Sequence, residues 1–318
     1  MSSSAPAAVG VDVGGTKLLA IAIDAQGDIV ARHQVATPTH HLGGELGSTL
    51  IEAVADVVEG LGLDDLPVGL GVPGMVDREG TLIYAPNLQS ATGAKLAERC
   101  SDRMGSAVVA IDNDATCATL AELRLGALRG VSEGVLITLG TGIGGGLVRG
   151  GEVSRGAHGF AGELGHMVVD RNGPACPCGS AGCWERYTSG AGLAYLAREA
   201  VSRGELAALA GDPAGITGVA VAELAAGGDR DAQAVVAESG WWLGLGVSNL
   251  VALLDPERVV IGGGVSVLGE ALLAPARAAL PGMLEGGARR DLPELVTAAL
   301  GPEAGAVGAA LMAMEASA

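Results

Sequence analysis

Residues 9–24 read V-G-V-D-V-G-G-T-K-L-L-A-I-A-I-D. Apolar residues alternate on both sides of Gly14 and Gly15, which predicts two strands joined by a tight hairpin, and residues 29–33 have the pattern of a third strand. Glycines in such a turn can adopt positive φ and bring backbone N–H groups close to a ligand. The stretch therefore predicts a sheet that starts on a glycine turn.

This turn has the composition of a phosphate-binding loop. Asp12 precedes the glycines on the first strand, and Thr16 and Lys17 follow with a hydroxyl and a cation. A plain hairpin turn is the structural alternative, but a plain turn needs neither the acid nor the lysine. We therefore expect phosphate binding here.

The same plan recurs at residues 134–148, which read G-V-L-I-T-L-G-T-G-I-G-G-G-L-V. A recurrence of strand, glycine turn and strand suggests two similar halves, each with one phosphate loop. Gly140, Gly142 and Gly145 also satisfy the dinucleotide fingerprint G-x-G-x-x-G. That fingerprint should begin a helix, whereas the residues after Gly145 have the pattern of a strand, so we favour a second phosphate loop over the dinucleotide interpretation.

Several buried strands deliver polar or glycine residues to their ends. Residues 108–114, V-V-A-I-D-N-D, predict a strand that ends in Asp112, Asn113 and Asp114 before a helix over 115–128. Ligands bind outside the carboxyl ends of strands in α/β sheets, although any one of these three residues could simply cap the helix. Residues 259–264, V-V-I-G-G-G, deliver three glycines to a helix start, which suits either an adenine ring or a tight turn.

Residues 163–185 contain E-L-G-H and then C-P-C-G-S-A-G-C-W-E. Three cysteines within eight positions, with a histidine upstream, are typical of a tetrahedral zinc site. Buried reduced cysteines are the alternative, but the proline and glycines between them predict a loop. Because four protein ligands complete a tetrahedron, we expect Zn²⁺ to be structural and to hold Glu163 and Glu185 in place. The expected ligands are His166, Cys176, Cys178 and Cys183.

Composition excludes several classes of partner. The chain has 318 residues, 19 basic and 36 acidic side chains and a formal net charge of −17, which argues against nucleic acid and against an anionic membrane. No signal peptide or membrane span is evident. Five cysteines, three of them clustered, suit a reducing cytoplasm, and Cys100 and Cys117 have the character of buried thiols without a role.

Two glycine hairpins, Asp12 and Asp114 together indicate phosphoryl transfer from a nucleotide, with Mg²⁺ on the phosphates and one base facing the attacking hydroxyl. Asp114 is the predicted catalytic base. The amide of Asn113 can both donate to and accept from sugar hydroxyls.

These segments resemble the ROK family of sugar kinases, within the actin/hexokinase/Hsp70 superfamily, and most of all its bacterial glucokinases. The resemblance rests on D-V-G-G-T-K, G-V-P-G-M-V-D, A-P-N-L, D-N-D-A, L-G-T-G-I-G-G-G, E-L-G-H, C-P-C-G-S-A-G-C-W-E and V-I-G-G-G-V, in the family's order from Asp12 to about Val265. One departure follows Asn87, where family glucokinases often carry a P-G-W-like segment and this chain has L-Q-S-A-T-G.

The resemblance implies an α/β fold of two actin-like (ribonuclease H-like) domains with an interdomain cleft for sugar and MgATP. We expect a small domain over residues 1–115, to which a helix over about 305–318 returns, and a large domain over 116–304 with the zinc loop. Asp12 would act on Mg²⁺ through water. Sugar contacts are expected from Gly74, Asn87, Asn113, Asp114, Glu163, His166 and Glu185. Nucleotide contacts are expected from Asp12, Gly14, Gly15, Thr16, Lys17, Thr141, Gly142, Gly262, Gly263 and Gly264.

The expected reaction is ATP-dependent phosphorylation of the 6-hydroxyl of an aldohexose, glucose first. Kinases for N-acetylmannosamine, N-acetylglucosamine, mannose or fructose are the alternatives within this class, and polyphosphate is an alternative donor. From other classes, a sugar-responsive regulator and a sugar sensor without activity remain as less favoured alternatives. We expect a homodimer or a higher homo-oligomer, because closed symmetric assemblies are the general rule.

Overall fold

The computed structural model describes residues 5–37, 47–63, 65–85, 88, 91–105 and 109–318. By its contacts the chain forms two compact units. Unit 1 contains Met1–Gly130, Gly146–Gly162 and Ala299–Ala318, and unit 2 contains Val131–Gly145 and Glu163–Ala298. None of the described helices is long and apolar enough to cross a membrane.

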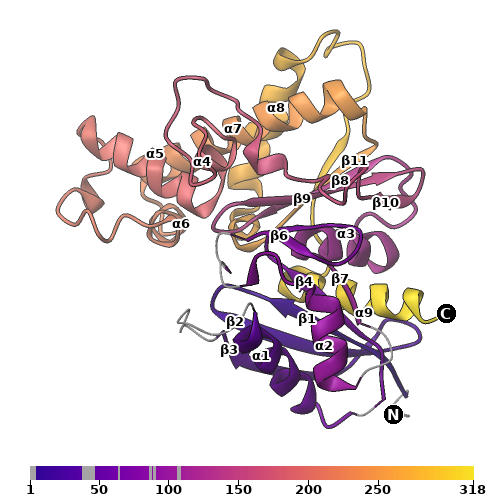
Figure 1. Ribbon diagram of the computed structural model, residues 1–318. Coiled ribbons are helices and arrows are strands. Elements are labelled where there is room, and N and C mark those ends of the chain that lie inside the picture. Colours follow the sequence, from indigo (N-terminus) through magenta and orange to yellow (C-terminus); the bar gives the residue numbers. More distant parts are fainter. Residues whose placement is uncertain (1–4, 38–46, 64, 86–87, 89–90, 106–108) are drawn as a thin grey trace. The chain divides into compact units, whose positions relative to one another are not determined.

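Unit 1 is built on a five-stranded sheet with the order β3-β2-β1-β4-β7 (Figure 1). The hairpins β1–β2 and β2–β3 are antiparallel, whereas β4 and β7 continue the sheet in parallel with β1. The predicted three-strand start of the chain is therefore confirmed. The strands are β1 (Pro6–Val13), β2 (Lys17–Asp24), β3 (Ile29–Ala36), β4 (Val68–Val72) and β7 (Val109–Asn113), and β5 (Met75–Val76) and β6 (Leu82–Tyr84) form a separate hairpin.

The helices of unit 1 are α1 (Ser48–Glu59), α2 (Leu96–Met104), α3 (Asp114–Leu125) and α9 (Ala304–Ala316). Helix α1 has its apolar residues three and four apart, and the buried ones, among them Leu50, Val54 and Val57, pack into one core with β1, β2 and β4. Burial of this apolar stripe, more than intrinsic helix propensity, stabilises a helix of this length.

Helix α9 packs closely on the sheet and on α3, as its small residues predict. Figure 1 shows it in yellow beside the indigo strands of unit 1. A Cβ at Gly10 of β1 or Gly69 of β4 would overlap backbone atoms of α9, and a Cβ at Gly308 of α9 would overlap the carbonyl of Cys117. These glycines are therefore required because backbone lies against backbone.

The second five-stranded sheet has the order β10-β9-β8-β11-β12. If the strands of each sheet are numbered in chain order, both sheets have the spatial order 3-2-1-4-5. This correspondence confirms the repeat that the two glycine turns suggest. The strands are β8 (Gly134–Leu139), β9 (Ile143–Arg149), β10 (Glu152–Ser154), β11 (Arg258–Gly262) and β12 (Glu294–Thr297), and the boundary between the contact units falls within β9.

The helices of unit 2 are α4 (Glu185–Thr188), α5 (Gly190–Ser202), α6 (Gly218–Ala226), α7 (Arg230–Leu254) and α8 (Glu270–Met283). Side chains cap three of them: Ser189 accepts from Gly192 N–H at the start of α5, and Thr217 and Asp229 do the same for α6 and α7. Helix α7 ends at Asp255, which has a left-handed conformation before Pro256.

The contact units divide the chain differently from the sequence-expected domains, because α3 packs against α9 and lies in unit 1. The expected division at 115/116 stays a prediction.

Candidate functional site

The carboxyl ends of β1, β4 and β7 lie along one edge of the sheet in unit 1. Asp12 pairs with Gly71 in the parallel register, and Gly71 pairs with Asp112 on its other side. Asp114 follows two residues later, with its Cα 3.5 Å from the position of a Cβ on Gly71. The chain therefore gathers three acids at one edge, and all three charges act on the buried thiol of Cys117, whose pKa is raised chiefly by burial.

The three acidic and amide residues at the end of β7 have different partners. Asp112 is buried and forms an ion pair with Arg155. Asn113 is the N-cap of α3, because its Oδ1 accepts from Ala115 N–H at 2.9 Å and from Thr116 N–H at 3.1 Å. The capping role thus belongs to Asn113, which leaves Asp114 as the first residue of the helix.

Asn113 also fixes the glycine predicted for the sugar site. Its Nδ2 donates to the carbonyl of Gly74 at 3.1 Å. The side chain therefore both caps α3 and holds Gly74, and one Nδ2 hydrogen is left for other contacts. Gly74 has a φ of 126°, and a Cβ there would overlap the carbonyl of Tyr84. Asn87, also expected at the sugar, lies outside the described residues.

The first glycine turn comprises residues 14–16 between β1 and β2. Neither Gly14 nor Gly15 has positive φ, so the expected reason for glycine is wrong. Glycine is needed at position 14 because a Cβ would lie 2.9 Å from the carbonyl of Lys17, whose oxygen accepts from Gly14 N–H. No described atom lies within 4 Å of a Cβ on Gly15, and Gly15, Thr16 and Lys17 are exposed. This side of the turn is open to a ligand.

Asp12 lies beneath this turn at the start of α9. Its carboxylate is 3.1–3.3 Å from the position of a Cβ on Gly305, in the first turn of that helix. Burial raises the pKa of Asp12 to about 6, and the charge of Lys17 opposes the shift. A carboxylate that is costly to ionise in the protein alone gains most from a cation placed beside it.

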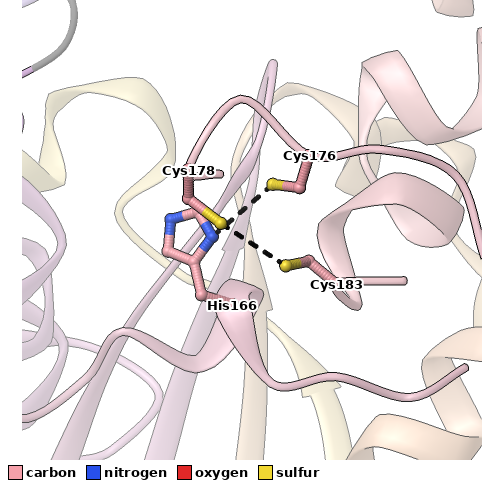
Figure 2. A group of neighbouring side chains, drawn as sticks. All are labelled: His166, Cys176, Cys178 and Cys183. Atoms are coloured by element: carbon pink, nitrogen blue, oxygen red, sulfur yellow. Dashed lines mark hydrogen bonds between the residues drawn. The ribbon is translucent and has the colours of Figure 1, made fainter. Parts of the chain in front are cut away.

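Four potential zinc ligands converge in unit 2. One nitrogen of His166 and the sulfurs of Cys176, Cys178 and Cys183 all lie within 4.8 Å of one another (Figure 2). The distance from Cys178 Sγ to Cys183 Sγ is 3.6 Å, and that from Cys176 Sγ to His166 Nδ1 is 3.8 Å. Ligands about 2.0–2.3 Å from a tetrahedral ion are separated by about 3.5–3.8 Å, so the donor set fits zinc.

Local backbone structure brings these ligands together. His166 ends a short 3₁₀ helix, η2 (Leu164–His166), and Val168 bridges to Cys183 across the loop. Gly182 has a φ of 69°, and a Cβ there would overlap the carbonyl of Asp170. Cys183 is thus held by a tight loop crossing that only glycine permits.

Glu185 connects the cluster to the second glycine turn. Its Oε1 accepts from Cys176 Sγ at 3.1 Å and lies 4.0 Å from His166 Nδ1. Its Oε2 lies against the turn, where Ile143 N–H approaches at 3.4 Å. Glu163 is 3.9 Å from His166 Nε2, and its pKa is raised by burial, with the charge of His166 opposing. Glu163, His166 and Glu185 therefore lie together.

A cavity of about 900 Å³ opens beside the second turn. Among the predicted nucleotide residues, Thr141 and Gly264 line it, and Gly142 contacts Glu185 instead. Gly263 has a φ of 79° and packs on Leu139, while Gly262 packs on Ala298, so these two glycines have structural reasons for their identity.

Sequence patterns missed most of the walls of this cavity, which come from α4, α5, α6 and the 3₁₀ turn after β11. The lining is chiefly aliphatic, as expected for a pocket that accepts a flat ring. Val219 and Val267 in this lining are 68% and 82% exposed, but no sequence pattern marks that exposure. The lining residues include Arg186, Leu193, Ala194, Ile216, Val219, Ala222, Val265, Val267 and Leu268.

Two sheets of the same strand order, each with a three-residue glycine turn after its first strand, define the fold of the actin-like ATPase and hexokinase superfamily. Residues 8–316 match the ROK family. The chain belongs to the ROK family.

Relatives of this chain match over nearly their whole length. It is 37% identical over 316 residues to a glucokinase of Streptomyces coelicolor, and the match covers 96% of this chain and 97% of the relative. It is 33% identical to an N-acetylmannosamine kinase of Escherichia coli, with 96% and 97% covered. A ROK family glucokinase from Streptomyces griseus, solved in complex with glucose and AMPPNP, has a TM-score of 0.84 and 38% identity and covers 97% and 99%.

Proposed function

We propose that this protein is an ATP-dependent sugar kinase that transfers a phosphoryl group to the 6-hydroxyl of an aldohexose, with glucose as its first substrate. The observation that carries the proposal is the full-length similarity to glucokinases, in a chain that retains the acid at the end of β7 and both glycine turns.

Asp114 is the proposed general base. It accepts the proton of the sugar hydroxyl as that oxygen forms a bond to the γ-phosphorus of ATP and the bond between this phosphorus and the β–γ bridging oxygen breaks. The products are the sugar 6-phosphate, ADP and a proton. Support comes from the position of Asp114 at the first turn of α3, where Asn113 already caps the helix.

Sugar binding is assigned to Asn113 and Gly74 in unit 1 and to Glu163, His166 and Glu185 in unit 2, with Asn87 as a further candidate. Carboxylates accept from two hydroxyls at once, which suits a polyhydroxylated ring. The free Nδ2 hydrogen of Asn113 is the group that supports its role.

The donor is assigned to the two turns and the cavity beside the second one. Thr141 and Gly264 line the cavity, so the adenine ring would lie among its aliphatic walls. Gly14, Gly15, Thr16, Lys17 and Gly142 would surround the phosphates. Mg²⁺, when bound, would neutralise phosphate charge, and Asp12 would hold it through water.

Zinc is assigned a structural role at His166, Cys176, Cys178 and Cys183. One of these ligands, His166, lies close to both Glu163 and Glu185, so the ion would fix the imidazole of His166 and, through it, the carboxylates that read the sugar.

A second candidate substrate is N-acetylmannosamine, because a kinase for this sugar is similar over the same length. A coupled assay for ADP release with MgATP should test glucose, mannose, fructose, N-acetylglucosamine and N-acetylmannosamine. We expect the highest kcat/KM with glucose. Strong turnover of an acetylated sugar beside little turnover of glucose would replace the proposed substrate, and no turnover of any sugar would reject the kinase assignment.

A further inference from the structure

Arg186 lines the donor cavity, and its side chain has no hydrogen bond or ion pair to any residue that the structure describes. It lies in α4 and lines the cavity together with Gly140 and Thr141. Its Nε is buried and has no hydrogen-bond partner, and among the described side chains it is the sole buried nitrogen or oxygen in this condition. Buried polar groups are nearly always paired, so an unpaired guanidinium at a cavity suggests a ligand.

Several other arginines of unit 2 have partners. Arg198, also at the cavity, donates to the carbonyl of Ile216 at 2.9 Å. Arg258 and Arg277 form ion pairs with acids. Because no described acid or carbonyl holds the Arg186 side chain, the donors on its two Nη atoms, unlike the buried Nε, are available to an anion in the cavity.

Arg186 lies shortly before the start of α5, which is hydrogen-bonded to the second glycine turn. Four residues later, Gly190 N–H donates to the carbonyl of Gly140 at 2.8 Å, and Ala191 N–H approaches that of Thr141 at 3.3 Å. Figure 1 shows α4 and α5 as consecutive helices in this region. With the bond from Gly192 N–H to Ser189 Oγ, these contacts hold the start of α5 against the second glycine turn.

The rest of the lining is chemically different from Arg186. Ile216, Val219, Val267 and Leu268 are apolar, and Glu223 is the acid among the lining residues. The cavity therefore combines two arginines, Arg186 and Arg198, with an aliphatic lining. A molecule that matches this distribution has an anionic chain joined to an apolar ring.

We propose that Arg186 binds the phosphate chain of the phosphoryl donor and so is a positioning residue for phosphoryl transfer. The inference rests on the proposed function, and it adds a donor contact that the two glycine turns do not supply. A planar guanidinium with several donors can bind two phosphate oxygens at once. The shared chemistry is a polyphosphate chain, which belongs to a nucleoside triphosphate and to inorganic polyphosphate alike.

The test compares the wild-type protein with Arg186→Gln and Arg186→Lys. Arg289→Gln is the matched control, because it removes the same charge from an exposed position in unit 2. The dissociation constants of ADP, adenosine and tripolyphosphate are measured by titration calorimetry, and KM for ATP and for glucose by coupled assay. Circular dichroism melting checks that each variant is folded.

We expect Arg186→Gln to raise the KM for ATP and the dissociation constant of ADP roughly tenfold or more, since bonds between charged groups are among the strong ones. Adenosine should bind unchanged and the KM for glucose should stay within about twofold. Arg186→Lys should recover part of the loss, and Arg289→Gln should match the wild type.

Unchanged ADP binding in Arg186→Gln would overturn the inference, as would an equal loss for adenosine, because that result would make Arg186 a structural part of the cavity. A larger loss for tripolyphosphate than for ADP would support the inference with inorganic polyphosphate as the donor. The proposed function fails separately: a wild-type protein that binds ADP through Arg186 but phosphorylates no sugar would reject the kinase assignment alone.

Discussion

The carboxylate of Glu185 occupies the space that a Cβ at Gly142 would need. The same carboxylate accepts from Cys176 and lies 4.0 Å from His166. A side chain at position 142 would therefore displace an acid proposed to hold sugar, although Gly142 itself belongs to the turn proposed to hold phosphate.

Gly142→Ala should consequently lower kcat/KM for the sugar by roughly 10- to 100-fold, because a shift of about 1 Å in a positioned group has effects of this size. The measurement is kcat/KM for glucose at saturating MgATP. Gly211→Ala is the control, since no described atom lies within 4 Å of a Cβ there. A normal kcat/KM in Gly142→Ala would show that Glu185 does not bind sugar.

Asp114→Asn should lower kcat by about 10²- to 10⁴-fold, as loss of a general base does. The amide keeps the shape of the side chain and an oxygen for Ala115 N–H, which Asp114 Oδ1 accepts at 2.8 Å, so α3 should still form. Steady-state kinetics measure the loss in kcat, and calorimetry checks that the variant still binds glucose. Asp102→Asn, on an exposed position of α2, is the control; near-normal turnover in Asp114→Asn would assign the base elsewhere.

Asp12 should make the stability of the protein depend on pH. Its pKa is raised from 3.8 to about 6 by burial, so its protonated form is favoured in the folded state. Its contribution to stability is complete below pH 3.8 and is lost as the pH rises through 6, at a cost of at most about 3 kcal/mol.

Asp12→Asn should therefore be more stable than the wild type at pH 7.5, and the difference should disappear by about pH 4. Urea unfolding at several pH values, without Mg²⁺, measures it. Kinase activity should fall at the same time if Asp12 holds the cation. Equal unfolding free energies at pH 7.5 would contradict the raised pKa.

Cys178→Ala should release zinc. This cysteine is exposed while Cys176 and Cys183 are buried, so the substitution removes a ligand without creating a core cavity. Elemental analysis should find about one zinc ion per wild-type chain and much less in the variant, with a raised KM for glucose. Cys100→Ala, which removes a buried thiol outside the cluster, should retain the metal. A wild-type protein free of zinc would falsify the metal assignment.

The sequence predicts what depends on neighbours in the chain. Alternation around residues 14–15 and 140–142 identifies both hairpins, and the strand after Gly142 excludes a dinucleotide fold. Cysteine spacing identifies a cluster that the loop then brings within bonding distance of one ion. In each case the residues concerned lie within about twenty positions of one another in the chain.

Assembly over long separations could not be predicted in this way. The cavity walls come from helices more than twenty residues apart, and no periodicity reveals that Ile216 faces the same space as Ala194. The choice of the N-cap among neighbouring residues could not be predicted either. Which of Asp112, Asn113 and Asp114 caps α3 depends on which side chain can reach the N–H groups of Ala115 and Thr116. At Gly14, glycine is explained by steric space and not by φ.

Helix α9 has a consequence for the order in which the chain can fold. It covers β1 and β4 through Gly10 and Gly69, yet it is encoded after all of unit 2. On the ribosome, the first sheet would therefore wait with one face uncovered while residues 131–298 are synthesised, and unit 2 can reach its final contacts first. Completion of the first unit would then be a late step that follows synthesis of unit 2, and the uncovered face of β1 and β4 is the surface that a chaperone would shield in the meantime.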